Sequence, residues 1–181
     1  MLCRFIAAVF TSNYSVTNQI ISLKRFNSRA KWSFIAFLCV SHFWYVSFLI
    51  LFASKCIRSL NVRGLNRARK RRQVFRWLHR QKSDIIFLQE TYSTPETIKR
   101  WETEWGGKIA YSHGSSHSRG VMILFKPRLD VCLEKTTTDN HGRSILTETL
   151  IDGTKVVCFN IYAPNDPNQQ VLFLGELSHL F

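Results

Sequence analysis

The sequence predicts an α/β domain built around a mixed sheet, and three observations support that prediction. Two apolar runs, at 57–62 and 84–90, have the length and composition of strands. Two amphipathic helical patterns, at 68–81 and 94–105, alternate with them. Five shorter strand-like segments then follow, with a hairpin signal among them. Helices that alternate with the first strands, followed by a run of paired strands, are typical of a layered α/β domain.

The first predicted strand and helix are separated by a short turn. The run at 57–62 is rich in apolar residues, and the sequence Arg-Gly-Leu-Asn at 63–66 has turn composition. The helix at 68–81 has a narrow apolar side, and basic residues cover the rest of its surface. We expect that side to consist of Val74, Trp77 and Leu78.

The second strand and helix have clearer boundaries. The segment 84–90 is a continuous apolar run between polar residues, which is typical of a strand buried on both faces. Proline at position 95 favours a helix that begins there, and Gly106-Gly107 ends it. The apolar positions of this helix, which we expect to point inward, are Ile98, Trp101 and Trp105.

The remaining chain is predicted to be mostly sheet. Asp152-Gly153-Thr154 between two apolar segments is a hairpin signal, and a final helix is expected at 169–180. The predicted strands of this part are 108–112, 120–125, 129–133, 144–151 and 156–162.

The composition excludes several classes of protein. With 45% apolar and 20% charged residues, the chain can form an ordinary core and is not disordered throughout. Eight glycines and four prolines exclude a collagen-like chain. Five cysteines without a Cys-x-x-Cys pair give no zinc knuckle or disulfide framework, and the odd number favours a reducing compartment. The formal net charge of +13 predicts a negatively charged partner, either nucleic acid or anionic lipid.

The charge is concentrated in one block of the chain. Residues 58–82 hold ten Lys or Arg and no acid, whereas residues 83–181 hold nine bases and all twelve acids. A composition break of this kind usually marks a boundary. We therefore expect an N-terminal extension at 1–56 and a folded domain at 57–181.

The extension contains an apolar segment at 32–53. Its 22 residues include no Asp, Glu, Lys or Arg, which is enough length for a membrane-spanning helix. Serines and a histidine dilute it, and only a few residues separate it from the first predicted strand. Two interpretations stay open. In the first, the segment is a membrane anchor. In the second, which we prefer, the whole extension does not belong to the domain.

Three of the predicted strands end in polar residues, and these residues are the candidates for chemistry. They are Asn61, Glu90, and the pair Tyr162 and Asn165. Ligands of open α/β sheets commonly bind beyond the carboxyl ends of strands, where the backbone is rigid and loops leave space. An amide, a carboxylate and a phenol at one such edge would suit Mg²⁺ with a phosphate, and Glu90 is the natural metal ligand.

Four sequence blocks together carry a family resemblance. SLNVRGL at 59–65, KSDIIFLQET at 82–91, SRGVMILF at 118–125 and NIYAPN at 160–165 resemble the endonuclease domain of LINE-type (non-LTR) retrotransposons. That domain belongs to the endonuclease/exonuclease/phosphatase superfamily, with the apurinic/apyrimidinic endonucleases. The resemblance covers about residues 57–181.

The resemblance implies a four-layer α/β sandwich and hydrolysis of a DNA phosphodiester with Mg²⁺, or with Mn²⁺ in its place. By this likeness Asn61 and Glu90 would hold the metal and its water, while Tyr162 and Asn165 would position the scissile phosphate and the nucleophile. The family also has a Gly-Asp-Phe-Asn block and a terminal Ser-Asp-His block, which complete the site. Neither block occurs in these 181 residues, so we expect this chain alone not to cut DNA.

Two other functions stay open. The basic helix could bind nucleic acid without cleavage, or the site could act on a phosphorylated lipid with 32–53 as its membrane anchor. A DNA partner favours a nuclear or cytoplasmic location, and a lipid substrate favours a membrane. The residues expected to contact nucleic acid are Arg63, Arg69, Lys70, Arg71 and Arg72.

Two further groups of side chains have ordinary structural explanations. His113 and His117 have a spacing that could chelate a metal, but a solvated Gly/Ser loop is the better explanation. Cys132 and Cys158 fall in predicted strands, where we expect them to be buried and unreactive.

Overall fold

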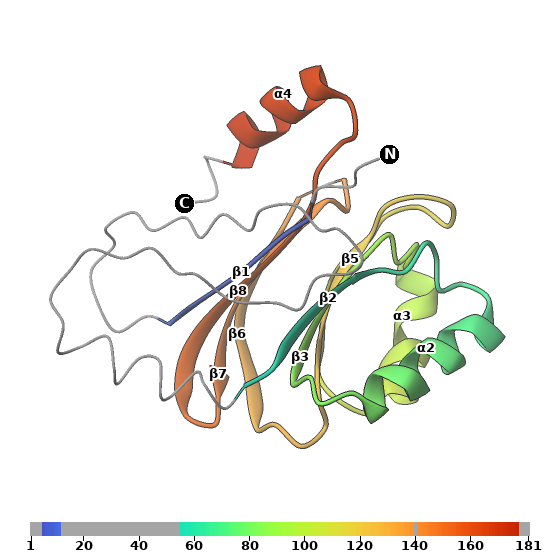
Figure 1. Cartoon of the computed structure of the whole chain (residues 1–181), viewed down its shortest axis with the longest axis vertical. Helices are drawn as coiled ribbons and strands as arrows, with labels where there is room; N and C mark the ends of the chain where they lie inside the picture. The colour runs from blue at the N-terminus through green and yellow to red at the C-terminus, as the bar shows by residue number, and fades with distance from the viewer. Residues whose placement is uncertain (1–4, 12–54, 140, 178–181) are drawn as a thin grey trace, which may run out of the picture.

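Two four-stranded sheets face one another in the computed structural model of the protein, which describes residues 5–11, 55–139 and 141–177 (Figure 1). The helix-covered sheet is mixed, because β2 and β3 are parallel and the other pairs antiparallel. Its strands, in spatial order, are β2 (Ile57–Asn61), β3 (Ile85–Gln89), β5 (Val121–Phe125) and β4 (Ile109–Ser112).

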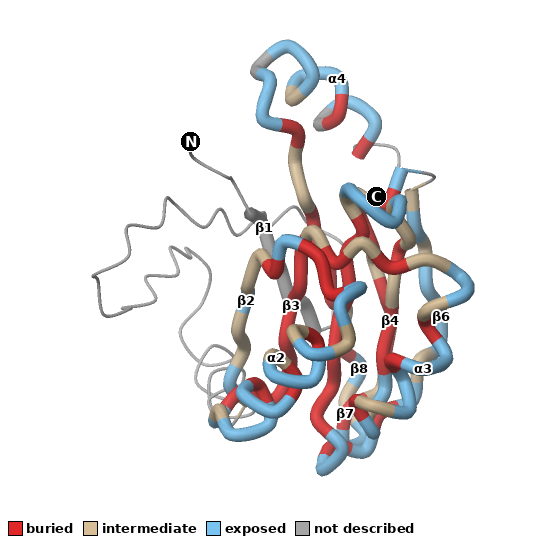
Figure 2. Tube along the Cα trace, turned by 90° about the vertical axis from the view of Figure 1, so that its right-hand side faces the viewer, coloured by how far each residue is buried: buried red, intermediate tan, exposed pale blue. Residues whose placement is uncertain are grey.

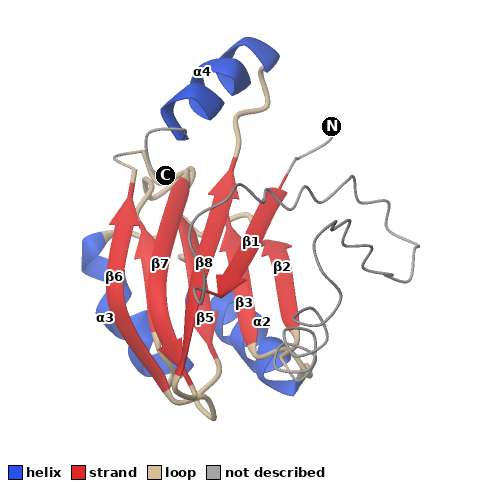
Figure 3. Ribbon diagram, turned by 90° about the vertical axis from the view of Figure 1, so that its left-hand side faces the viewer, coloured by secondary structure: helices blue, strands red, loops and turns tan. Residues whose placement is uncertain are grey.

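The antiparallel sheet forms the opposite layer (Figure 3). Its strands, in spatial order, are β1 (Phe5–Thr11), β8 (Thr154–Tyr162), β7 (Ser144–Ile151) and β6 (Val131–Thr138). The hairpin between β7 and β8 turns at Asp152 and Gly153, as predicted. Both residues have positive φ, 48° and 76°, as in the two-residue turns whose twist suits a hairpin.

Helices α2 (Ala68–Arg80) and α3 (Pro95–Trp105) cover the outer face of the first sheet (Figure 1). A capping box between Thr94 and Thr97 begins α3, and Gly106 ends it in the left-handed region at φ 75°. A third helix, α4 (Pro167–Leu177), packs Phe173 and Leu177 against residues of β8.

The core lies in two layers on either side of β3 and β5, whose residues are all buried. Alternate side chains of β3 point to opposite faces. Ile86 and Leu88 pack against α2 and α3, whereas Ile85 and Phe87 pack against the antiparallel sheet. This arrangement confirms the prediction of an α/β domain with a mixed sheet.

The helices differ in how well their inward faces were predicted. Ile98, Trp101 and Trp105 of α3 are buried as expected. On α2 the expectation for Trp77 is wrong, since its side chain is 43% exposed and Arg58 lies over its ring. Phe75 takes the buried position instead.

Two boundaries and one cysteine also need correction. Strand β6 extends to Thr138, beyond the predicted end at 133, because the polar residues from Lys135 onward pair with β7 after a bulge. Helix α4 begins at Pro167 rather than 169, and residues 178–181 lie outside the described residues. Cys132 is exposed, because it lies on the outward face of β6, while Cys158 is buried as expected.

The N-terminal segment is described only at 5–11. There the backbone of β1 pairs antiparallel with β8. The apolar segment 32–53 lies outside the described residues, and so does most of the predicted extension at 1–56, whose boundary stays a prediction. None of the helices in the described ranges has the length and hydropathy needed to cross a membrane.

Candidate functional site

Three of the four candidate site residues meet at one edge of the paired sheets. Asn61 is the last residue of β2, Glu90 directly follows β3, and Tyr162 ends β8. The Tyr162 hydroxyl donates to Glu90 Oε1 at 2.6 Å, and Asn61 Nδ2 donates to the same oxygen at 2.8 Å. Both sheets therefore contribute to one hydrogen-bonded trio, which we define as Asn61, Glu90 and Tyr162.

The backbone around Glu90 is held in an unusual conformation. Glu90 has a φ of 53° and Tyr92 a φ of 59°, and positive φ costs a non-glycine residue about 1–3 kcal/mol. Hydrogen bonds on both sides fix this turn. The Gly64 N–H donates to the Glu90 carbonyl at 2.6 Å, and the Thr91 N–H donates to the Gly120 carbonyl at 2.9 Å. The strain thus coincides with the candidate metal-binding carboxylate.

A buried polar pair lies directly beneath the trio and joins the two sheets. Gln89 Nε2 donates to Asn160 Oδ1 at 2.7 Å, and both residues have no exposed surface. Asn160 Nδ2 donates to the carbonyls of Leu88 and Met122, each at 2.9 Å. Sequence analysis missed this interlayer pair, although an asparagine inside a buried strand was the available signal.

Tyr92 is a further neighbour of Glu90 that the sequence did not single out. Its hydroxyl donates to Glu90 Oε2 at 3.4 Å. Burial, followed by the negative charge of Glu90, raises the pKa of Tyr92, so its phenol stays a hydrogen-bond donor. The ring lies so close to Gly64 that a Cβ there would approach it to 2.5 Å.

Two arginines bring positive charge to the same edge. The Arg143 guanidinium lies 5.6 Å from the centre of the Tyr162 ring, and its Nη1 donates to the Tyr162 carbonyl at 3.3 Å. Burial, and then the neighbouring charge of Arg119, lowers the pKa of Arg143. Because a phosphodiester is anionic, this half-buried cation beside Tyr162 suits a phosphate oxygen.

Asn165, the fourth candidate, is not hydrogen-bonded to the trio in the part of the chain that the structure describes. It is exposed in the segment 163–166, between β8 and α4. That segment is tied to α4 through Gln170, whose Nε2 donates to the Pro164 carbonyl at 2.8 Å.

The five predicted nucleic-acid contacts fall into different environments. Arg63, Arg69 and Arg72 are exposed. Lys70 Nζ donates to the carbonyls of Val62 and Arg63, so it closes the turn before α2.

Arg71 corrects the expectation most clearly. Only 2% of it is exposed, and its guanidinium makes two hydrogen bonds of 2.8 Å to the Glu104 carboxylate on α3. It also donates to the carbonyls of Leu65 and Asn66. Arg71 therefore joins α2 to α3 and is not available to a phosphate.

The histidine pair at 113 and 117 gathers no metal site. His113 is half-buried, hydrogen-bonds to Ser93 Oγ at 3.2 Å and lies against the Tyr111 ring, while His117 is exposed. Burial lowers the pKa of His113. No three His, Cys, Asp or Glu side chains gather into a metal-ligating group within the described ranges.

The donor chemistry of Glu90 and Asn61 fits a hard divalent cation. Glu90 Oε1 accepts two short hydrogen bonds. Among the residues that the structure describes, Oε2 accepts the longer one from Tyr92 and keeps lone-pair capacity. Asn61 Oδ1 accepts the Arg63 N–H and retains a second lone pair. Mg²⁺ usually binds through one or two carboxylates plus water and phosphate oxygens, so one carboxylate is sufficient here.

Comparison with known proteins agrees with this geometry. Residues 59–179 match the Endonuclease/Exonuclease/phosphatase family. A Xenopus laevis protein described as "Transposon TX1 uncharacterized 149 kDa protein" is 30% identical over 122 residues. These residues are 67% of this chain and 9% of that protein, so the chain spans a small part of its relative.

Proposed function

Because the chain belongs to the Endonuclease/Exonuclease/phosphatase family and is of retrotransposon origin, we propose that the trio acts on a DNA phosphodiester with Mg²⁺, or Mn²⁺ in its place. We propose a four-layer α/β sandwich for its nuclease/phosphodiesterase-type domain. One observation carries the proposal, the shared hydrogen bonding of Glu90 Oε1 by Tyr162 and Asn61 across the two sheets.

The roles of the residues follow from their contacts. Glu90, through Oε2, and Asn61, through its carbonyl oxygen, would hold the metal ion. The ion would stabilise the negative charge on the phosphoryl oxygens and on the leaving oxygen. Tyr162 orients Glu90 through its one O–H, which would have to move from Glu90 to a phosphate oxygen for Tyr162 to position the substrate. Arg143 adds positive charge beside Tyr162. We propose that Asn165 approaches the phosphate from the loop after β8.

We further propose that this chain binds the metal but does not cut DNA by itself. By the resemblance, the aspartate and asparagine of one block act at the attacking water and the Asp-His pair of another completes the site, and the 181 residues contain neither block. A general base contributes on the order of 10²–10⁴-fold to the rate, so its absence would slow cleavage by about that factor. A DNA substrate and an odd thiol count support a nuclear or cytoplasmic location.

Lipid phosphodiesters are the alternative substrates of this superfamily. The relationship to a transposon protein favours DNA, because a mobile element must act on a genome.

The test measures metal binding and cleavage separately. Titration of the full chain with Mn²⁺, followed by electron paramagnetic resonance, should show one site that is lost in Glu90→Gln. The control Glu102→Gln removes the same charge from an exposed position of α3 and should bind as the parent does. Unchanged binding in Glu90→Gln would refute the assigned site.

The cleavage arm uses supercoiled plasmid and Mg²⁺. We expect nicking by the parent chain to equal that of Glu90→Gln. Nicking that depends on Glu90 would support the phosphodiesterase site but disprove the proposed inactivity, since a base would then exist within the chain.

A further inference from the structure

Much of helix α2 is exposed (Figure 2), and several of its exposed positions are arginines. At 100° per residue its exposed arginines fall within one quadrant of the helix and extend over about 16 Å of its length. We call this set the arginine stripe. It consists of Arg69, Arg72, Arg76 and Arg80, all of which are exposed.

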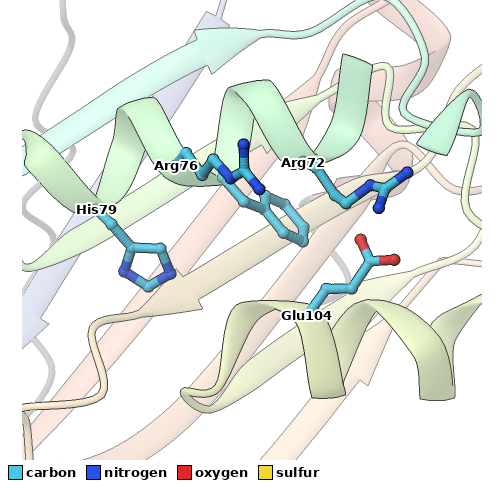
Figure 4. Close-up of a pocket in the computed structure, with 5 residues that line it drawn as sticks. Arg72, Arg76, His79 and Glu104 are labelled. Carbon is cyan, nitrogen blue, oxygen red and sulfur yellow. The ribbon is translucent and has the colours of Figure 1, made fainter. Parts of the chain in front are cut away.

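A hollow of about 210 Å³ lies beside the stripe, between α2 and α3 (Figure 4). Arg72, Arg76 and His79 line it from α2, and Glu104 lines it from α3. Glu104 is already neutralised, because the buried Arg71 binds both of its carboxylate oxygens. The hollow therefore keeps an excess of positive charge from Arg72 and Arg76.

The helix dipole favours Arg80, in the last turn of α2, but not the cations near the amino end. The first turn of α2 contains no acid, and Arg69 and Arg72 lie near its amino end, where the helix dipole disfavours cations. Within the described residues, Arg69, Arg76 and Arg80 form no salt bridge. A bound anion would offset both the mutual repulsion of the stripe and the unfavourable dipole.

We propose that the arginine stripe binds a nucleic-acid backbone at a surface separate from the trio. A strand carries one phosphate per 3.4 Å of duplex axis, so the stripe is long enough to contact several phosphates in succession. Guanidinium groups match phosphate oxygens in pairs, which favours arginine for this purpose.

A lipid surface fits this helix less well. Helices that lie on membranes insert an apolar face between headgroups. The apolar face of α2 is occupied instead, since Phe75 and Leu78 are buried against the helix-covered sheet. The stripe offers charge without an adjacent free apolar face.

The topology separates this surface from the proposed site of cleavage. Because β2 and β3 are parallel, α2 must return the chain from the trio's edge to the opposite edge of the sheet. Arg69 is therefore nearest the trio and Arg80 is farthest from it. Nucleic acid bound along the stripe leads away from the trio, so the stripe binds a segment other than the one at Glu90.

The test is a fluorescence anisotropy titration of the full chain with a labelled 20-base-pair duplex between 50 and 200 mM salt. The triple variant Arg72→Gln, Arg76→Gln and Arg80→Gln should lower the slope of log K against log salt by about 3 and weaken binding on the order of 10²-fold. The matched control removes three exposed charges from the rest of the surface and should leave the slope nearly unchanged. Its substitutions are Lys108→Gln, Lys135→Gln and Lys155→Gln.

Two further arms make the result decisive. In EDTA, which removes any divalent metal ion, the slopes of the parent and the arginine triple variant should still differ by about 3, so a failure of the proposed metal site leaves this inference standing. Equal weakening in both triple variants would show only a general effect of net charge and overturn the stripe. Tighter binding to phosphatidylserine vesicles than to the duplex would also overturn it.

Discussion

The interlayer pair offers a direct test of how the two sheets are held together. In Asn160→Ala, three buried hydrogen bonds disappear at once, those to Gln89 Nε2 and to the carbonyls of Leu88 and Met122. Each lost bond is worth about 1 kcal/mol net, because folding exchanges water bonds for protein bonds. The expected loss in the free energy of unfolding is therefore about 3 kcal/mol.

The remaining contacts do not cancel this loss. Gln89 Nε2 retains its 3.1 Å bond to Ser59 Oγ, so the glutamine is not left wholly unpaired. Asn160→Asp should be at least as destabilising as the alanine variant, because it turns a carboxylate oxygen toward two carbonyl oxygens. A loss of 3 kcal/mol corresponds to a fall in Tm of about 6–12 °C for a chain of this size.

The measurement is urea unfolding at 25 °C, followed by circular dichroism and by tryptophan fluorescence. Asn66→Ala is the matched control, since Asn66 is exposed and makes one hydrogen bond from its side chain, to the Ser116 carbonyl. It should cost less than about 1 kcal/mol. If Asn160→Ala falls within 0.5 kcal/mol of that control, the interlayer pair does not hold the sheets as argued.

Two further predictions concern buried groups away from the trio. Arg71→Met should lower the free energy of unfolding by about 3 kcal/mol. This is the low end for a broken buried ion pair, because the Glu104 side chain is 22% exposed and can rehydrate. The control Arg72→Met should change the free energy of unfolding little. The hydrogen bonds from Arg71 lower the pKa of Glu104. Their contribution to the free energy of unfolding is therefore full above about pH 4.5 and is lost as the pH falls through the lowered pKa. Urea unfolding from pH 3 to 6 should show a weaker pH dependence of stability in Arg71→Met than in the parent, and an identical pH dependence would contradict the pairing. Burial raises the pKa of Cys158 to about 12, so iodoacetamide at pH 8 should modify the exposed Cys132 but not Cys158, and mass spectrometry showing equal labelling would disprove that burial.

The sequence predicted those strands and helices whose own residues mark their type and their ends. Strand β3 was recognisable because both of its faces are buried, so its apolar residues are consecutive. Helix α3 was recognisable because Pro95 and Gly106 mark its ends. The meeting of Asn61, Glu90 and Tyr162 followed from the rule that ligands gather at the carboxyl ends of strands.

The errors arose where a residue's burial or strand pairing depends on a segment that is distant in the sequence. Arg71 has the composition of its basic neighbours, and only Glu104 on α3 makes its burial favourable. Trp77 was placed inward by its helical spacing from Val74 and Leu78, but the buried face of α2 is formed by Arg71, Phe75 and Leu78. The polar end of β6 has no strand pattern of its own, and its backbone is paired by β7. Single-sequence patterns contain none of these partners.

The strained turn at Glu90 explains how its carboxylate reaches Tyr162 at all. In β3 the side chains of Ile86 and Leu88 face the helices, whereas Phe87 and Gln89 face the antiparallel sheet. Continued alternation would direct Glu90 toward the helices, away from Tyr162.

A φ of 53° ends the strand and breaks that alternation. Glu90 then turns toward the second sheet, where Asn160 and Tyr162, two residues apart on β8, face the same way. Gln89 and Glu90 thus both contact the antiparallel sheet, although neighbouring strand residues normally cannot. The interlayer pair fixes the distance between the sheets, and the strained turn directs the carboxylate across it. Geometry at the trio therefore depends on both features, and neither alone would bring Glu90 to Tyr162.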